Sequence, residues 1–111
     1  MVSLSGCSRD VKPLELAQQN CDADKHGTQL LDHGNTLIIK AVDPSKSSLT
    51  ILELGCTLNE LKSSAAVVSH IETTRAIDGR QTDSWGNYKA AWSYHPDQGL
   101  DLVIQENSEV A

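Results

Sequence analysis

Cys56 and the four histidines are the residues of this chain best suited to nucleophilic or acid–base chemistry. Cys56 lies where we expect a strand to pass into a helix, and a thiol at a helix N-terminus can have a lowered pKa. His70 follows roughly 20 Å further along an ideal helix, so it cannot act as the base for this thiol. The base would have to be His26, His33 or His95 brought close by folding. The sequence therefore favours a structural or disulfide-bonded Cys56 over a nucleophile.

The same side chains show no spacing that is typical of a metal centre. No two histidines form the i, i+4 pair that zinc enzymes use. Cys21, His26 and His33 could meet across a loop as three zinc ligands, but ordinary surface histidines are the favoured interpretation. We predict no metal site.

Asp22-Ala23-Asp24-Lys25-His26-Gly27 resembles the first half of an EF-hand calcium loop, which alternates oxygen ligands and has glycine at its sixth position. The match fails at the fifth position, where His26 replaces an oxygen ligand. It fails again at the twelfth, where His33 stands in place of glutamate. A polar turn is the better interpretation.

Leu4-Ser5-Gly6-Cys7 resembles a lipobox, the processing site of bacterial lipoproteins. The resemblance implies lipidation of Cys7 and a place in the bacterial periplasm or cell envelope. It would leave Cys21 and Cys56 as a disulfide pair, a bond worth ~3–4 kcal/mol in the chain-entropy model. Only Met1-Val2-Ser3 precede the motif, so no export signal is present as written. The alternative is a cytoplasmic protein with three ordinary thiols.

Composition excludes several classes of partner. The formal net charge of −6 argues against nucleic acid, which requires a basic face. No stretch approaches the roughly 20 apolar residues of a membrane-spanning helix. P-loop, dinucleotide, G-x-S-x-G and H-E-x-x-H motifs are absent from the sequence, and we expect no cofactor.

All aromatic residues of the chain fall within one short segment: Trp85, Tyr88, Trp92 and Tyr94. On a strand, alternation places the last three on one face. If a loop of two or four residues pairs His95 with Leu100, that face meets Asp101 and is exposed. Exposed aromatic side chains on a small protein mark a contact surface. A register shifted by one residue would instead turn them into the core.

These segments must be positioned by a small number of elements. The pattern predicts an α+β fold whose parts are a short helix from Pro13, a β-hairpin over about 36–54, a main helix over about 58–73 and a second hairpin over about 88–105. Thr57-Leu58-Asn59-Glu60 fits the capping box that would open the main helix. Loops are expected over 25–35 and 78–87. Both helices should pack on one face of the antiparallel sheet.

The domain organisation follows from the same pattern. We expect a flexible segment or tether over 1–12, a single domain over 13–106 and a frayed tail over 107–111. The function that fits best is a binding or interaction module for a protein or small-molecule ligand. Its predicted contact residues are Trp85, Tyr88, Trp92, Tyr94, Arg80 and Asp101. A homodimer through the second hairpin is an equally simple use of that surface. The competing class is a small enzyme with a thiol or pocket site near Cys56.

Overall fold

The sheet of this protein is antiparallel, and buried side chains alternate with more exposed ones along most of its strands. A computed structural model describes residues 12–44 and 47–106. In chain order its elements are α1 (Pro13–Cys21), β1 (Thr28–Leu31), η2 (Asp32–Gly34), β2 (Thr36–Ala41), α2 (Ile51–Glu60), α3 (Ala65–Glu72), η3 (Ala76–Asp78), β3 (Gln81–Trp85), β4 (Tyr88–His95) and β5 (Gly99–Glu106).

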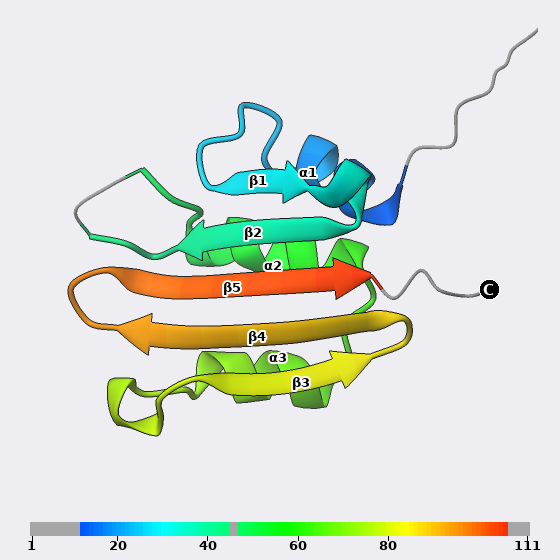
Figure 1. Cartoon of the computed structure of the whole chain (residues 1–111). Helices are drawn as coiled ribbons and strands as arrows, with labels where there is room; N and C mark the ends of the chain where they lie inside the picture. The colour runs from blue at the N-terminus through cyan, green and yellow to red at the C-terminus, as the bar shows by residue number, and fades with distance from the viewer. Residues whose placement is uncertain (1–11, 45–46, 107–111) are drawn as a thin grey trace, which may run out of the picture.

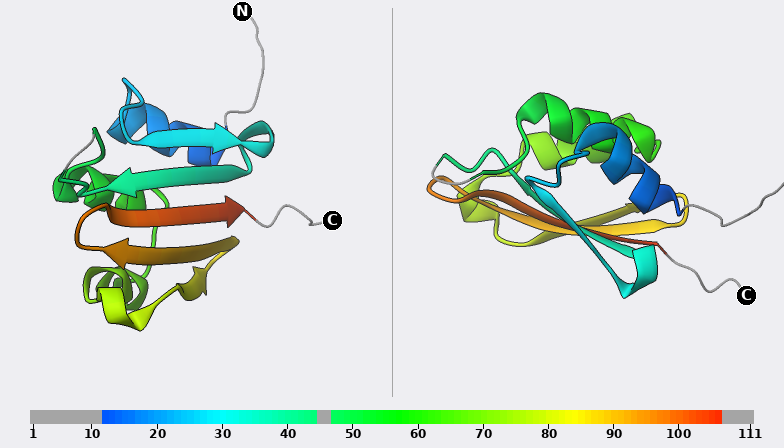
Figure 2. Two further views of the ribbon diagram at one scale, coloured as in Figure 1. Left: turned by 60° about the vertical axis from the view of Figure 1, so that its left-hand side comes forward. Right: turned by 90° about the horizontal axis from the view of Figure 1, so that it is seen from above.

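The five strands form one antiparallel sheet in the order β1-β2-β5-β4-β3 (Figure 1). The three α-helices lie together on one side of it, as the view from above shows (Figure 2). The predicted α+β class, with helices packed on one face of the sheet, is confirmed. No helix among the described residues is both long and apolar enough to span a bilayer.

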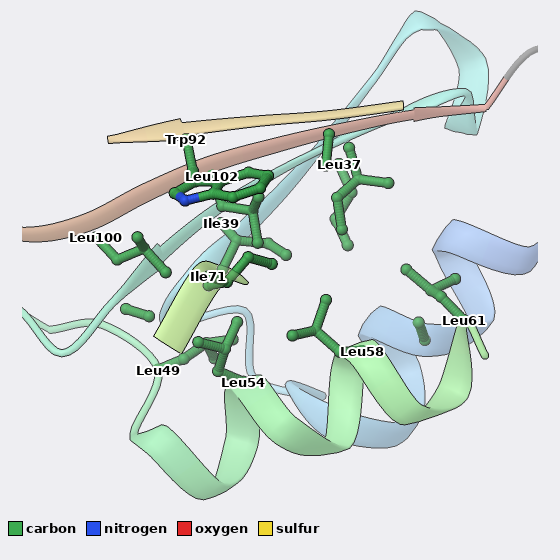
Figure 3. Close-up of a cluster of buried hydrophobic side chains, with 14 of the residues drawn as sticks. Leu37, Ile39, Leu49, Leu54, Leu58, Leu61, Ile71, Trp92, Leu100 and Leu102 are labelled. Carbon is green, nitrogen blue, oxygen red and sulfur yellow. The ribbon is translucent and has the colours of Figure 1, made fainter. Parts of the chain in front are cut away.

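The core lies between the sheet and the helices (Figure 3). Between β2 and the central strand β5 the antiparallel register brings Leu37 opposite Ile104 and Ile39 opposite Leu102, all on the helical side. The helices contribute buried side chains at helical spacing: Leu14 and Ala17 from α1, Leu54 and Leu58 from α2, Val67 and Ile71 from α3.

The predicted strand over 49–54 is wrong, because helix α2 begins there. The Thr50 hydroxyl accepts a hydrogen bond from Glu53 N (3.1 Å), and the Glu53 carboxylate accepts one from Thr50 N (2.9 Å). This capping box opens the helix seven residues before the expected one. Thr57 is instead buried inside α2, where its hydroxyl donates to the Glu53 carbonyl.

The predicted single helix over 58–73 is two helices with a break between them. α2 ends at Glu60, and Lys62 adopts a left-handed backbone with φ 59°. Ser64 then caps α3 by accepting a hydrogen bond from Val67 N (3.2 Å). The chain reverses at this break, so α2 and α3 lie side by side over the sheet (Figure 1).

Both segments predicted as loops contain an edge strand. The first hairpin is formed by β1 and β2 around η2, instead of spanning 36–54. β3 pairs with β4 through a tight turn at Gly86-Asn87, with Trp85 opposite Tyr88. The β3 sequence, Gln-Thr-Asp-Ser-Trp, has no aliphatic residue, and only Thr82 and Trp85 are of types that favour a strand.

The expected register of the β4–β5 hairpin is wrong by one residue. His95 pairs with Gly99, and Trp92 therefore pairs with Leu102 on the helical side of the sheet. Trp92 is 0% exposed, and Tyr94 is half-buried against the same core. The predicted outer aromatic face does not exist.

Gly99 fixes this register. Its φ is +77°, and a Cβ at this position would lie 2.4 Å from the Ala41 carbonyl oxygen. Only glycine combines that backbone conformation with so close an approach. β5 therefore begins opposite His95, after the loop of Pro96, Asp97 and Gln98.

A disulfide joins Cys21 at the end of α1 to Cys56 in the middle of α2. Their Cα atoms are 5.7 Å apart, and the two cysteines are 35 positions apart in the sequence. The pairing that the lipobox interpretation implied is thus present. Cys7 and its motif lie outside the described residues, as do the predicted tail over 107–111 and all but the last residue of the predicted tether.

Trp92→Ala tests the observed register. Because the indole is fully buried, its removal should lower the free energy of unfolding by about 3–5 kcal/mol. Chemical denaturation measures the loss. Ile77→Ala, at a side chain that is 82% exposed, is the matched control and should change stability by less than about 0.5 kcal/mol. Equal, small effects of the two variants would contradict the register.

Loss of the disulfide should weaken the helical layer. In the chain-entropy model, opening a loop of this length costs about 3–4 kcal/mol of unfolding free energy. We expect that loss in the Cys21→Ala, Cys56→Ala double variant, measured by urea denaturation against the oxidised protein. An intact mass showing both thiols free in the unreduced protein would overturn the assignment.

Candidate functional site

A cleft of about 590 Å³ opens where the end of α2 meets the β3–β4 turn and the start of α1. We call it the aromatic cleft. The residues that decide its chemistry are Pro13, Leu61, Lys62, Trp85, Asn87 and Tyr88. It combines two of the six predicted binding residues with four that the sequence did not single out.

Trp85 forms a fixed wall of the aromatic cleft. It is the last residue of β3, and its indole Nε1–H donates to the Leu61 carbonyl at 2.9 Å. Its ring centroid lies 5.6 Å from that of Tyr88, with the planes tilted by 40°. Both side chains are half-buried, so part of each ring faces the cleft. The hydrogen bond restricts the indole to one orientation.

Tyr88 lies at the start of β4, opposite Glu106 of β5. Burial raises the pKa of the phenol, and the negative charge of Glu106 raises it further. The hydroxyl is therefore protonated throughout the physiological range and offers a hydrogen-bond donor.

Two opposite charges border the aromatic cleft. Glu60 accepts a hydrogen bond from the Asn20 amide at 3.1 Å. Lys62 is exposed on the left-handed turn after α2 and forms no ion pair within the described chain. Its ammonium group is therefore available to a ligand that carries an acceptor.

The other four predicted binding residues do not join this site. Trp92 is core, and Tyr94 lines a different cavity near the β4–β5 turn. Arg80 is exposed between η3 and β3, and Asp101 lies on the face of the sheet away from the helices. There Asp101 pairs with Lys40, with 2.5 Å between Nζ and Oδ1. The predicted contact set is thus divided among separate parts of the molecule.

Cys56 does not occupy the position expected of a nucleophile. It lies within α2, away from any strand-to-helix turn, and its sulfur is bonded to Cys21. The disulfide also removes Cys21 from the hypothetical zinc set. The thiol-enzyme interpretation therefore loses the free thiolate on which it depended.

His26 connects the turn after α1 to the start of α2. Its Nδ1 lies 2.6 Å from Asp24 Oδ1 and 2.7 Å from Asp22 Oδ1, and its Nε2 lies 2.9 Å from Glu53 Oε1. The hydrogen bonds to Asp24 and then to Glu53 raise the pKa of His26 to about 9. The imidazole is therefore a cation at neutral pH.

The group Asp22, Asp24 and His26 has the geometry to hold a metal ion, with ligand atoms within 4.8 Å of one another. However, the buried Asp22 carboxylate already accepts bonds from His26 N (3.0 Å), Gly27 N (3.1 Å) and Thr28 Oγ1 (2.6 Å). Burial raises the pKa of Asp22, but these bonds lower it below the ordinary value overall. The segment forms a hydrogen-bonded polar turn, in agreement with the sequence interpretation.

His70 occupies a second polar cluster, at the edge of the sheet. Its Nδ1 lies 3.0 Å from Asp83 Oδ2 and its Nε2 lies 3.2 Å from Gln81 Oε1. The bond to Asp83 and then the bond to Gln81 raise its pKa. The imidazole also contacts the Trp92 ring edge-on, with centroids 4.7 Å apart. Both ring nitrogens have partners, so neither is free to act as a base.

No protein-family model, curated protein or solved structure matches this chain.

The His26 network predicts a pH dependence of stability. Folding raises the pKa of the imidazole from its ordinary 6.5 to about 9, so its ion pairs stabilise the protein fully below pH 6.5. That stabilisation is lost as the pH rises from about 6.5 through 9. Unfolding free energies of the wild type and His26→Gln should therefore differ at pH 6 and converge by pH 10. A difference that is constant over this range would contradict the network.

Proposed function

We propose that this protein is a small binding module that takes a flat, mostly apolar group into the aromatic cleft. One observation carries the proposal: two half-exposed aromatic rings, Trp85 and Tyr88, lie side by side in a cavity of about 590 Å³. That volume is within the range of about 300–1,000 Å³ that small-molecule sites occupy. The binding role follows the sequence hypothesis, but on a different surface.

The rigidity of the wall supports a binding role. The bond from the Trp85 indole to the Leu61 carbonyl already holds the ring in place, so little side-chain freedom remains to be lost when a ligand binds. Pro13 adds a second rigid apolar group. Aromatic side chains of this kind offer a large contact area at low entropic cost.

The polar groups of the cleft narrow the class of ligand. Lys62 supplies a cation and Asn87 an amide, while the Glu60 carboxylate on the same border already accepts a hydrogen bond from the Asn20 amide. These groups suit an aromatic ring that bears a carboxylate or carbonyl. Such a ring occurs on small organic acids and on peptide side chains next to backbone carbonyls, so both sources satisfy the same chemistry.

The lining of the aromatic cleft favours binding over catalysis. Its described residues include no histidine, cysteine or aspartate, its one carboxylate, Glu60, accepts a hydrogen bond from the Asn20 amide, and the hydroxyl of Ser64 caps α3. A nucleophile with an adjacent base is the usual signature of covalent catalysis. The disulfide supports a working place in an oxidising compartment, such as a bacterial periplasm.

Titration with 2-naphthoate and its neutral primary amide tests the proposal. The chain has two tryptophans, so two indole N–H signals report separately in a proton–nitrogen correlation spectrum. We expect the Trp85 signal to shift and the buried Trp92 signal to stay. Trp85→Ala should abolish binding, and Tyr94→Ala, an aromatic truncation outside the aromatic cleft, should retain it.

Lys62→Ala provides a variant that leaves the fold intact, because the side chain is exposed. It should weaken naphthoate binding about three- to tenfold, the effect of losing one exposed ion pair, and leave amide binding nearly unchanged. Backbone signals of the aromatic cleft that still shift in Trp85→Ala would overturn the proposal. Shifts centred on residues outside the aromatic cleft would overturn it as well.

A further inference from the structure

A second cavity, of about 310 Å³, lies at the opposite end of the α2–α3 pair from the aromatic cleft. It opens where α2 begins and α3 ends, beside the β4–β5 turn. Its walls are mainly apolar and include Val42, Ile51, Leu54, Ile71, Tyr94 and Leu100. We call it the apolar pocket. Its volume is at the low end for ligand sites and suits one or two aliphatic side chains.

The rim of the apolar pocket exposes aliphatic side chains to solvent. Val42 is 39% exposed and Ile51 is 54% exposed, and the neighbouring Leu52 is 82% exposed. Three adjacent exposed aliphatic residues beside an apolar hollow form the kind of patch that marks a contact surface.

Val42 also holds an unfavourable backbone conformation. Its φ is +47°, a region that β-branched residues very rarely adopt. The bond from Val42 N to the Leu49 carbonyl (2.8 Å) helps to hold the chain there. Glycine or asparagine would be less strained at this position. Valine at the pocket rim therefore strains the backbone locally, and the chain carries an aliphatic side chain there despite this strain.

The polar groups of the pocket indicate the charge of its occupant. The Thr74 hydroxyl is already used, since it donates to the His70 carbonyl (2.7 Å) and accepts from Trp92 Nε1 (2.8 Å). Glu72 is the charged residue of the lining, and it forms no ion pair in the part of the chain that the structure describes. An apolar group flanked by a cation would complement this surface.

We propose that the apolar pocket is a docking site for a partner protein that inserts one aliphatic side chain and places an adjacent lysine or arginine against Glu72. A second copy of this chain fits less well. A two-fold contact would bring Glu72 of one chain toward Glu72 of the other, between two chains that each have a net charge of −6. The proposed site is independent of the aromatic cleft.

Short synthetic peptides test the docking site directly. The probe has leucine flanked by lysines, and its matched controls replace the lysines with glutamate or the leucine with serine. We expect the leucine–lysine peptide alone to shift the backbone signals of Val42, Ile51 and Glu72 at millimolar concentration. Equal binding of the leucine–glutamate peptide, or no shift at these residues, would overturn the proposal.

Variants separate docking from general attraction to an acidic protein. Glu72→Gln should raise the Kd about three- to tenfold, the effect of one exposed ion pair. Glu15→Gln, the same charge change on α1, should leave the Kd unchanged. Equal effects of the two variants would show only nonspecific attraction and would overturn the proposal.

Val42→Asn tests whether the strained valine serves binding. Because asparagine tolerates the left-handed backbone, we expect the melting temperature to hold or rise while peptide binding weakens. Undiminished binding would contradict the role of Val42. Analytical ultracentrifugation of the wild type tests self-association through the pocket. If the wild type is a dimer and Ile51→Asp dissociates it, the pocket binds a second copy of the chain and the proposal is overturned.

Discussion

The close approach of Gly99 to the backbone of residues 41–43 constrains the rest of the sheet. Since no side chain fits between them, the start of β5 lies directly against the end of β2. The same glycine pairs with His95, which sets the register of β4. This register decides, for each side chain of the last hairpin, which face of the sheet it lies on. Trp92 points toward the helices (Figure 3).

Trp92 then links the sheet to the helical layer. Its indole N–H bonds to the Thr74 hydroxyl, and its ring contacts His70 of α3. This polar attachment of a large apolar side chain fixes where α3 ends. The apolar pocket exists because α3 ends there, over the turn between β4 and β5. The two cavities thus occupy opposite ends of the α2–α3 pair, and the buried indole attaches the end of α3 to the sheet.

The sequence was sufficient for elements whose signals are local. Pro13 marked the first helix, and the branched run from Thr36 marked β2. It was insufficient where two local signals compete. Thr50-Ile51-Leu52-Glu53 and Thr57-Leu58-Asn59-Glu60 both fit a capping box, and only packing of Leu54 and Leu58 against the sheet selects the first. β-branched residues at the start of α2 gave it the appearance of a strand.

The candidate site shows the same limit. The clustering of aromatic residues in the sequence places Trp85 and Tyr88 close together, because they are near neighbours across a tight turn. Leu61, Lys62 and Pro13 reach them only through tertiary packing, for which no spacing in the chain gives a signal. The register depended on whether the hairpin loop had three residues or an even number. The positive φ required at Gly99 was the available clue.

The disulfide between Cys21 and Cys56 has a topological consequence. It encloses β1, β2 and the connection to α2 in a covalent ring, while β3, β4 and β5 lie outside that ring. A protease that cuts the backbone once inside the ring therefore leaves one covalent molecule. The two pieces separate only after reduction. The N-terminal half of the fold consequently keeps its connection to the C-terminal strands even when the peptide chain between them is broken.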